Sequence, residues 1–296
     1  MANTIQTAAT VLAKETLRSM LLNYPMITLL AHRFSEAYTF NETVKVPLIA
    51  STTATDYDTT NGYVPADQSV TAVSVVINKH KHATHALNPQ EFAQVNPAII
   101  AELANVGGHA LGKQIVDDIV ALVLSSNFSN STTAATLDFD HLASADKALA
   151  DRGTPEFGKY SVVNSQGFLD LLSDDTIHSG LTNWSGGKPT EAISTGQIGN
   201  VLGMGISRYA GMADNSQNLK GWVASPDAIA IAAGIPTEPT EGNPVALNVE
   251  TDPRTGLSIL QRIWVDANLG SYKRTVTIVY GIKVGQAGAL QRLTSS

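Results

Sequence analysis

PAIIAELANVGGHALGKQIVDDIVALVL, residues 97–124, carries the strongest periodic pattern of this chain and decides how the rest must fold. Apolar residues recur in it at three- and four-residue spacings, which predicts an amphipathic α-helix that begins at the Asn96-Pro97 signal. At about 1.5 Å per residue this helix would be about 40 Å long. Gly107 and Gly108 lie inside it, where they allow close packing or a bend.

Upstream of this helix the chain predicts two strands joined by an unusually long polar loop. VKVPLIA, residues 44–50, is typical of an edge strand because Pro47 cannot donate to a ladder, and residues 70–82 predict a second strand. Residues 51–69 between them contain the turn dipeptide Asn61-Gly62 and no Lys or Arg. Polar loops of this length are uncommon inside compact domains, so we expect a hairpin excursion held by a neighbouring chain.

The N-terminal segment and the stretch before the long helix add helical signals. Residues 7–22 predict an amphipathic N-terminal arm that Pro25 ends or kinks, and we expect this arm to find its cover on sister copies of the chain. Asn88-Pro89-Gln90-Glu91 has the spacing of a capping box, which predicts a helix start there or soon after.

Downstream, residues 127–243 predict a mixed α/β lobe, with helical or strand-like pieces at 142–151, 160–164 and 167–172. In the same lobe, residues 222–225 predict a strand and residues 226–233 the start of a helix. Period-two patterning then predicts three closing strands at residues 245–250, 257–265 and 274–284, the first two joined by a turn at 252–256. We expect this sheet to pack on the long helix, which makes the middle lobe an insertion.

Composition narrows the class of function. Charged residues are only 15% of the chain, which suggests a surface largely covered by other copies, and a net charge of −7 disfavours binding to a phosphate backbone. The absence of Cys excludes disulfides and cysteine metal sites. The N-terminus lacks a signal-peptide pattern and no apolar run approaches membrane-spanning length, so we expect a soluble protein that is not processed for secretion.

The order of these elements resembles the Hong Kong 97 capsid fold of tailed-bacteriophage major capsid proteins. The resemblance rests on VKVPLIA, the hairpin, VTAVSVVINKH leading into the long helix, and the ending TVTIVYGIKVGQAGALQRL. It implies an α+β chain with an N-terminal arm, an extended loop, a peripheral lobe that contains a spine helix and closing sheet, and an inserted axial lobe. The corresponding residues are 1–43 for the arm, 44–82 for the loop, 83–126 and 244–296 for the peripheral lobe, and 127–243 for the axial lobe.

The same resemblance implies a structural protein and not an enzyme. Hexamers and pentamers of the subunit would form an icosahedral phage head around double-stranded DNA, in the virion, after assembly in the cytoplasm of the bacterial host. The implied partners are other copies, a portal, and scaffolding or decoration proteins, with no membrane. Alternatives are an encapsulin-like compartment shell, a histidine-metal hydrolase and a monomeric binding module. One branch of the family links subunits through a loop lysine, but residues 51–69 contain none, which predicts a non-covalent shell.

The candidate contact residues between subunits are polar and aromatic groups of the loop and the basic end of the strand that follows. They are Asp56, Tyr57, Asp58, Asn61, Gly62, Tyr63, Asp67, Lys79, His80, Lys81 and His82. On a strand, Lys79 and Lys81 share one face and His80 and His82 the other. This basic cluster could meet the loop carboxylates of a neighbour.

Three residue patterns could suggest a metal, phosphate-binding or catalytic site. His80, His82 and His85 are the best metal-ligand candidates. Only His80 and His82 share a face of the predicted strand, no third ligand is evident nearby, and the positive charges of Lys79 and Lys81 oppose the binding of a cation. We therefore predict no metal, cofactor or catalytic site. Residues 196–205 are glycine-rich without a phosphate-binding motif, which favours a tight turn. Asp174, Asp175 and His178 lack a nucleophile motif and are interpreted as turn residues.

Overall fold

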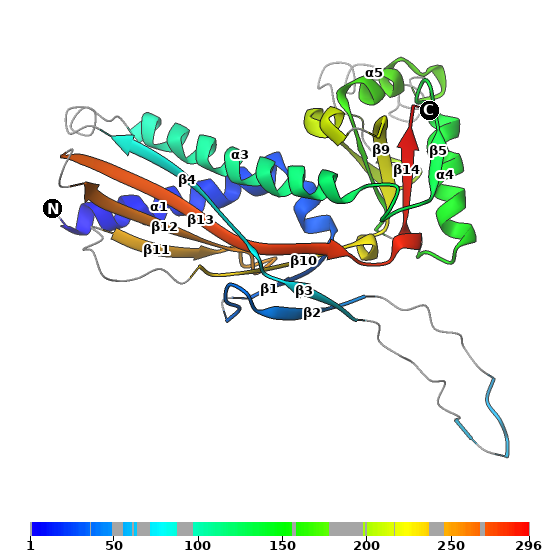
Figure 1. Cartoon of the computed structure of the whole chain (residues 1–296), viewed down its shortest axis with the longest axis horizontal. Coiled ribbons are helices and arrows are strands. Elements are labelled where there is room, and N and C mark those ends of the chain that lie inside the picture. Colours follow the sequence, from blue (N-terminus) through cyan, green and yellow to red (C-terminus); the bar gives the residue numbers. More distant parts are fainter. Residues whose placement is uncertain are drawn as a thin grey trace, which may run out of the picture.

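The structure is a computed structural model that describes residues 2–35, 37–48, 56–60, 62–63, 72–87, 97–155, 158–177, 198, 200–215, 217–236, 246–266 and 270–295. In this part of the chain there are two lobes, each built on a six-stranded sheet, and a separate two-stranded hairpin (Figure 1). The α+β class predicted from the sequence is confirmed.

The first lobe combines two long helices with one sheet. The sheet has the order β1-β10-β13-β12-β11. Strand β13 is long enough to pair with two strands along the side opposite β12: its residues 272–280 pair with β4 and its residues 279–284 pair with β10. The bounds are Ala2–Asn23 for α1, Pro25–Leu29 for the 3-10 helix η1, Ala31–Phe34 for β1, Lys79–Leu87 for β4, Pro97–Leu122 for α3, Ile229–Gly234 for β10, Ala246–Thr251 for β11, Ser258–Asp266 for β12 and Ser271–Val284 for β13.

The second lobe has a sheet of order β5-β14-β9-β6-β8-β7, with α4 and α5 beside it (Figure 1). The bounds are Ser131–Thr133 for β5, Phe139–Asp151 for α4, Tyr160–Val163 for β6, Ser165–Ser173 for α5, Asn200–Val201 for β7, Met204–Arg208 for β8, Ala210–Asn215 for η2, Leu219–Ala224 for β9, Pro226–Ala228 for η3, Ala287–Ala289 for η4 and Leu290–Thr294 for β14.

The hairpin consists of β2, Thr43–Pro47, and β3, Ala72–Val76, paired from Thr43 opposite Val76 to Pro47 opposite Ala72. Its base is anchored, because Val44, Val46 and Val75 are buried against Ala232 and Val279 of the first sheet. The predicted hairpin, with Pro47 on an edge strand, is confirmed.

The long helix α3 covers one face of the first sheet. Leu111, Ile115 and Ile119 lie in one buried cluster with Ile278 and Tyr280 of β13. The helix begins at Pro97 as predicted and ends two residues before the predicted Leu124. The expected packing of the closing sheet on the long helix is therefore confirmed.

Helix α1 lies beside α3 on the same face of the sheet (Figure 1). The helix predicted in the N-terminal arm is confirmed, but the expectation that sister copies cover it is wrong, since Ala9, Ala13 and Met20 are buried in the subunit itself. Small residues permit this contact. A Cβ placed on Gly108 would lie 2.5 Å from the carbonyl oxygen of Thr16, so the two backbones touch at that glycine.

Arg274 of β13 joins both helices to the sheet from a buried position. Its guanidinium donates to the carbonyl oxygen of Leu103 at 3.1 Å, to the Thr16 hydroxyl at 2.7 Å and to the Gln261 side chain at 3.1 Å. Burial lowers the pKa of Arg274 to about 10, so the group remains charged at neutral pH. Gln261 in turn donates to the carbonyl oxygen of Ala9 at 3.0 Å, which ties the start of α1 to β12.

Two predicted elements are wrong. The single strand expected over residues 70–82 is two strands, because β3 pairs with β2 whereas β4 pairs with β13. Between β3 and β4 the chain crosses β13 at Gly281, where the absence of a side chain leaves room for the Val76 carbonyl. The helix expected at 226–233 is a short η3 followed by β10. Residues 229–233 are buried on both faces, and an apolar run of that kind does not distinguish a strand from a helix by periodicity.

The predicted boundaries between lobes also differ from the observed pairing. Strand β10 falls inside residues 127–243 but pairs with β13 of the first sheet, and β14, which falls inside residues 244–296 and was not predicted as a strand, pairs with β9 of the second. The chain therefore passes between the lobes more often than a single insertion requires. The predicted capping box at residues 88–91 lies outside the described residues.

Replacing Gly108 with alanine should destabilise the subunit by about 1–3 kcal/mol, because the new methyl group would meet backbone that cannot move without separating α1 from α3. The matched control is Gly107→Ala, whose Cβ would have no heavy atom nearer than 3.8 Å and which should gain up to about 1 kcal/mol of helix propensity. Urea unfolding of both variants checks this. A Gly108→Ala subunit at least as stable as wild type would contradict the close helix contact.

Candidate assembly surface

The face of the first sheet opposite the helices carries a shallow pocket of about 430 Å³. Three neighbouring strands supply its walls through side chains at alternate positions. The lining residues are His80, His82 and Thr84 of β4, Arg262 and Trp264 of β12, and Lys273, Thr275 and Thr277 of β13. We call this the outer-face pocket. Its ionisable side chains are all basic.

Two of these side chains are held in place by neighbours. The Arg262 guanidinium lies over the Trp264 ring at 5.2 Å from the ring centroid, a cation–π arrangement. Lys273 forms an ion pair of 2.5 Å with Asp266 at the end of β12. The sequence prediction missed Arg262, Trp264 and Lys273. The period-two pattern of β12 and β13 placed them on common faces, but only the pairing of these strands with β4 brings them to the histidines.

The predicted alternation along β4 is confirmed. His80 and His82 are exposed, whereas Lys79 and Lys81 are half-buried on the face toward α3. Lys79 forms an ion pair of 2.9 Å with Asp118 of α3, which also accepts a hydrogen bond of 2.6 Å from the Tyr280 hydroxyl. Lys79 is thus committed to its own subunit, whereas His80 and His82 face outward together with Thr84.

The three histidines considered for metal binding do not converge. His85 lies on the opposite face of β4 from His80 and His82, with its Nε2 close to Gly107 of α3. Burial lowers the pKa of His85, and the charge of Arg274 lowers it further. Among the residues that the structure describes, no group of three His, Cys, Asp or Glu side chains could hold a metal ion. The hydrolase alternative therefore has no assembled site in this region.

The loop between β2 and β3 ends in a small ordered turn. The Gly62 amide donates to the Asp58 carbonyl oxygen at 2.8 Å, and the Asp58 carboxylate accepts from the Thr60 amide at 2.8 Å. Gly62 has a φ of 73°, the left-handed region expected of an Asn-Gly turn. Asn61 and Asp67, also predicted as contact residues, lie outside the described residues.

Two tyrosines and an acidic residue project from this turn. The rings of Tyr57 and Tyr63 meet edge to face with centroids 5.0 Å apart, yet they are 59% and 91% exposed. Asp56 beside them is also exposed. Figure 1 shows residues 56–60 and 62–63 far from both sheets, so these side chains have no cover from the described part of their own subunit. We call residues 56–60 and 62–63 the loop tip.

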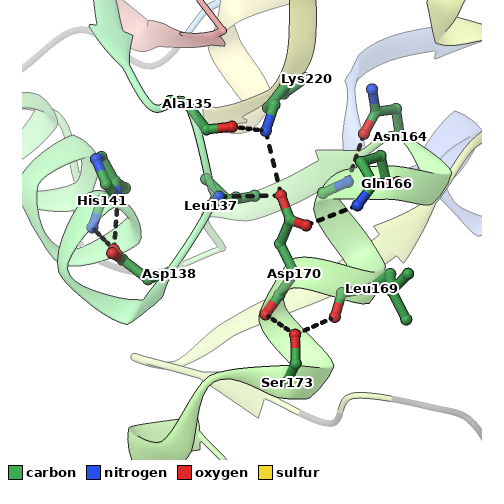
Figure 2. Close-up of polar contacts among 11 residues, drawn as sticks. Ala135, Leu137, Asp138, His141, Asn164, Gln166, Leu169, Asp170, Ser173 and Lys220 are labelled. Atoms are coloured by element: carbon green, nitrogen blue, oxygen red, sulfur yellow. Dashed lines mark hydrogen bonds and ion pairs between the residues drawn. The ribbon is translucent and has the colours of Figure 1, made fainter.

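The second lobe contains the acidic residues that could suggest chemistry, but they serve the fold. Asp170 of α5 accepts hydrogen bonds from the Leu137 amide, the Gln166 side chain and the Lys220 ammonium, the last at 3.1 Å (Figure 2). Burial alone would raise the pKa of Asp170, but these hydrogen bonds and the charge of Lys220 outweigh it and hold the pKa below its usual range. The network joins the segment before α4 to α5 and β9.

Asp138 and Asp174 are helix caps. Asp138 accepts from both the His141 amide and the His141 ring at the start of α4 (Figure 2). Asp174 accepts from the amides of Phe139 and Ile177, in agreement with its interpretation as a turn residue. The glycine-rich segment contributes a two-residue hairpin turn between β7 and β8, and His178 lies outside the described residues.

No protein-family model and no curated protein matches this chain. Solved structures do match. A chain of Mycobacterium phage Che8 is 23% identical, with a TM-score of 0.54 over 86% of this chain and 84% of that one. The capsid of cyanophage P-SCSP1u is 14% identical, with a TM-score of 0.56 over 90% and 86%. A virus-like particle from Pyrococcus furiosus is 12% identical, with a TM-score of 0.53 over 96% and 98%.

The predicted resemblance to tailed-phage capsid proteins is therefore confirmed at the level of the fold. In the described part of the chain no helix is both long and apolar enough to cross a membrane.

Asp170→Asn should cost about 2 kcal/mol of subunit stability at pH 7, because it leaves the largely buried Lys220 charge without its anionic partner. Folding lowers the pKa of Asp170. The contribution of the Asp170 carboxylate to the free energy of unfolding is therefore complete above the unfolded pKa of about 3.9 and is lost as the pH falls through the folded pKa. The wild-type advantage should therefore shrink between about pH 5 and pH 2. Urea unfolding monitored by tryptophan fluorescence measures it.

The control is Asp175→Asn, which changes an exposed carboxyl five residues further along the chain and should alter stability by less than about 0.5 kcal/mol. Equal effects of the two substitutions at pH 7 would contradict the assignment of Asp170 as an anchor of the second lobe.

Proposed function

We propose that this chain is the major capsid protein of a tailed bacteriophage, and that copies of it form hexamers and pentamers of an icosahedral head around double-stranded DNA. The observation that carries the proposal is the loop tip, which holds two tyrosines exposed and away from its own subunit. Large aromatic side chains dominate the energetics of protein interfaces, so a subunit that projects them is built to be completed by another protein.

The arrangement of the chain supports the same proposal in finer detail. In this proposal the extended loop runs from β2 to β3, because residues 79–82 at the end of the predicted loop belong to β4 of the first sheet. Helix α3 is the spine of a peripheral lobe, and the second lobe occupies the axial position of a Hong Kong 97-like subunit. Helix α1 covers its own sheet, so in this proposal the loop and not the arm reaches a neighbouring copy. The low charge content and negative net charge suit a shell that surrounds DNA without sequence-specific binding.

The loop tip and the outer-face pocket are chemically complementary. The tip presents the Asp56 carboxylate beside aromatic rings, and the pocket presents Arg262, Lys273 and two histidines around Trp264. We infer that the tip of one copy lies on the outer-face pocket of the next. His80 and His82 then belong to this contact, as the sequence indicated, while Lys79 acts within its own subunit.

This role is structural and not catalytic. The subunit would be a component of the virion, assembled in the host cytoplasm, with a portal and scaffolding or decoration proteins as further partners. A second candidate is an encapsulin-like compartment shell, favoured by the match to the virus-like particle over nearly the full length of both chains. Particles that enclose protein cargo and no DNA, purified from the cells that naturally make them, would select this second candidate.

The purified chain should assemble into rings or closed shells, which size-exclusion chromatography and negative-stain electron microscopy detect. Because no lysine lies in residues 51–69, boiled particles should run as the 31.2 kDa subunit in SDS, without a ladder of multimers. A ladder would overturn the non-covalent shell. A monomer at all concentrations, with and without the other phage head proteins, would overturn the proposed function.

The contact between loop tip and pocket can be tested by charge reversal. Asp56→Arg and Arg262→Glu should each weaken assembly about tenfold, because each places like charges together, and the double variant should recover part of the loss. Glu102→Arg, an exposed reversal on α3, is the matched control and should leave assembly unchanged. The measurement is the protein concentration at which particles form. If the two single-variant losses of assembly free energy simply add in the double variant, a direct contact is contradicted.

A further inference from the structure

The contact between β4 and α3 encloses an imidazole nitrogen that makes no hydrogen bond to any residue that the structure describes. His85 is half-buried on the face of β4 toward α3, and the nitrogen in question, its Nε2 atom, is buried. The Nε atom of Arg274 is also buried without a partner in the same part of the chain. Arg274 lies directly opposite His85 in the pairing of β13 with β4, so the two residues meet at one contact.

Gly107 of α3 marks the place where these two side chains reach the helix. A Cβ placed on Gly107 would lie 3.8 Å from Nη1 of Arg274 and 3.9 Å from Nε2 of His85. Both nitrogens therefore face one small region of the helix surface. The guanidinium cannot leave this region without loss of its other bonds, because the same Nη1 donates to the carbonyl oxygen of Leu103 one turn earlier. His85 is thus held beside a fixed positive charge.

A neutral His85 ring suits these surroundings and a protonated ring does not. In a neutral imidazole one nitrogen carries no proton, so it can face a guanidinium without repulsion. In the protonated ring both nitrogens carry a proton. Protonation would therefore place an N–H group at a buried position without an acceptor among the described residues, and a second positive charge beside Arg274. In agreement, burial and the charge of Arg274 both lower the pKa of His85.

The other charged groups on β4, and on the β13 and α3 elements that pack against it, do not offset this repulsion. Most of them are paired with each other, exposed to water or on the opposite face of the sheet. They are Lys79 with Asp118, Lys113 with Asp117, Lys273 with Asp266, the exposed Glu102, His109 and Lys283, and His80 and His82 on the outer face. Lys81 shares the face of His85 and adds positive charge there.

We propose that His85 is a pH-sensitive joint of the subunit, at which protonation of the imidazole weakens the packing of the first half of α3 on β4. The joint is closed in neutral solution and loosens in mild acid. Its position gives it a consequence for the rest of the chain, because β4 is the strand that leads from the β2-β3 hairpin toward α3. The inference adds a conformational response to the proposed function and does not depend on it, since the folded subunit alone shows the response.

The first test compares wild type with His85→Gln, which is neutral at every pH and keeps a polar side chain. Because folding lowers the pKa of His85, the stabilisation by the neutral ring is complete above the unfolded pKa of about 6.5 and is lost as the pH falls through the folded pKa. Within that window the unfolded chain binds up to one more proton at His85. The ratio of the wild-type unfolding constant to that of the variant should therefore rise by up to about tenfold per pH unit.

Urea unfolding between about pH 7.5 and pH 5.5, on the chain kept below its assembly concentration, measures this ratio. The interval lies above the range in which Asp170 loses its charge. His32→Gln, which removes an exposed histidine of the same sheet, is the matched control and should keep the pH dependence of wild type. A ratio between wild type and His85→Gln that does not change over this interval overturns the proposal.

The second test uses wild-type protein alone, so it holds even if the variant fails to fold. Among the imidazole NMR signals of the seven histidines, one should titrate well below pH 6.5. Hydrogen exchange, corrected for the intrinsic effect of pH, should accelerate in residues 102–110 of α3 as that signal titrates, and less in residues 115–122. Titration of all seven signals at about 6.5 or above, or unchanged protection of residues 102–110, would show that the joint does not exist.

Discussion

The contact between α1 and α3 at Gly108 is the constraint on which the first lobe depends. Because the carbonyl of Thr16 occupies the space where a side chain at Gly108 would lie, the two helices pack closely side by side on one face of the sheet. Arg274 then bonds both helices from the sheet beneath, through neutral oxygens of Thr16 and Leu103. A buried guanidinium requires all of these acceptors at once, so it fixes the relative position of three elements.

A subunit held together in this way leaves two features without cover in its described residues: the loop tip and the outer-face pocket. Each costs free energy in an isolated chain, since aromatic or apolar surface stays in water. A modest contact repeated around closed rings stabilises an assembly strongly, because each subunit is held at several places at once.

The polar groups that could suggest catalysis have structural roles instead. Asp170 and Asp174 order the second lobe by accepting backbone and side-chain hydrogen bonds, and Asp118 holds Lys79 and Tyr280 against the spine helix. Each carboxylate is saturated by groups of its own subunit, which is the condition for a stable charge near the interior. His80 and His82 share one face of β4 and His85 lies on the other, so the three histidines do not converge on one site.

The sequence alone determined the spine helix, the arm helix, the hairpin and the closing strands, because periodicity reports which face of an element is apolar and turn residues mark its ends. It could not determine which surface covers α1, that residues 229–233 form a strand of the first sheet and not a helix, or that residues 290–294 form a strand of the second sheet. Tertiary structure alone decided these points, since burial on both faces erases periodicity and strand pairing joins residues far apart in the chain. The outer-face pocket arose the same way, from Arg262 and His82 on strands that only the sheet brings together.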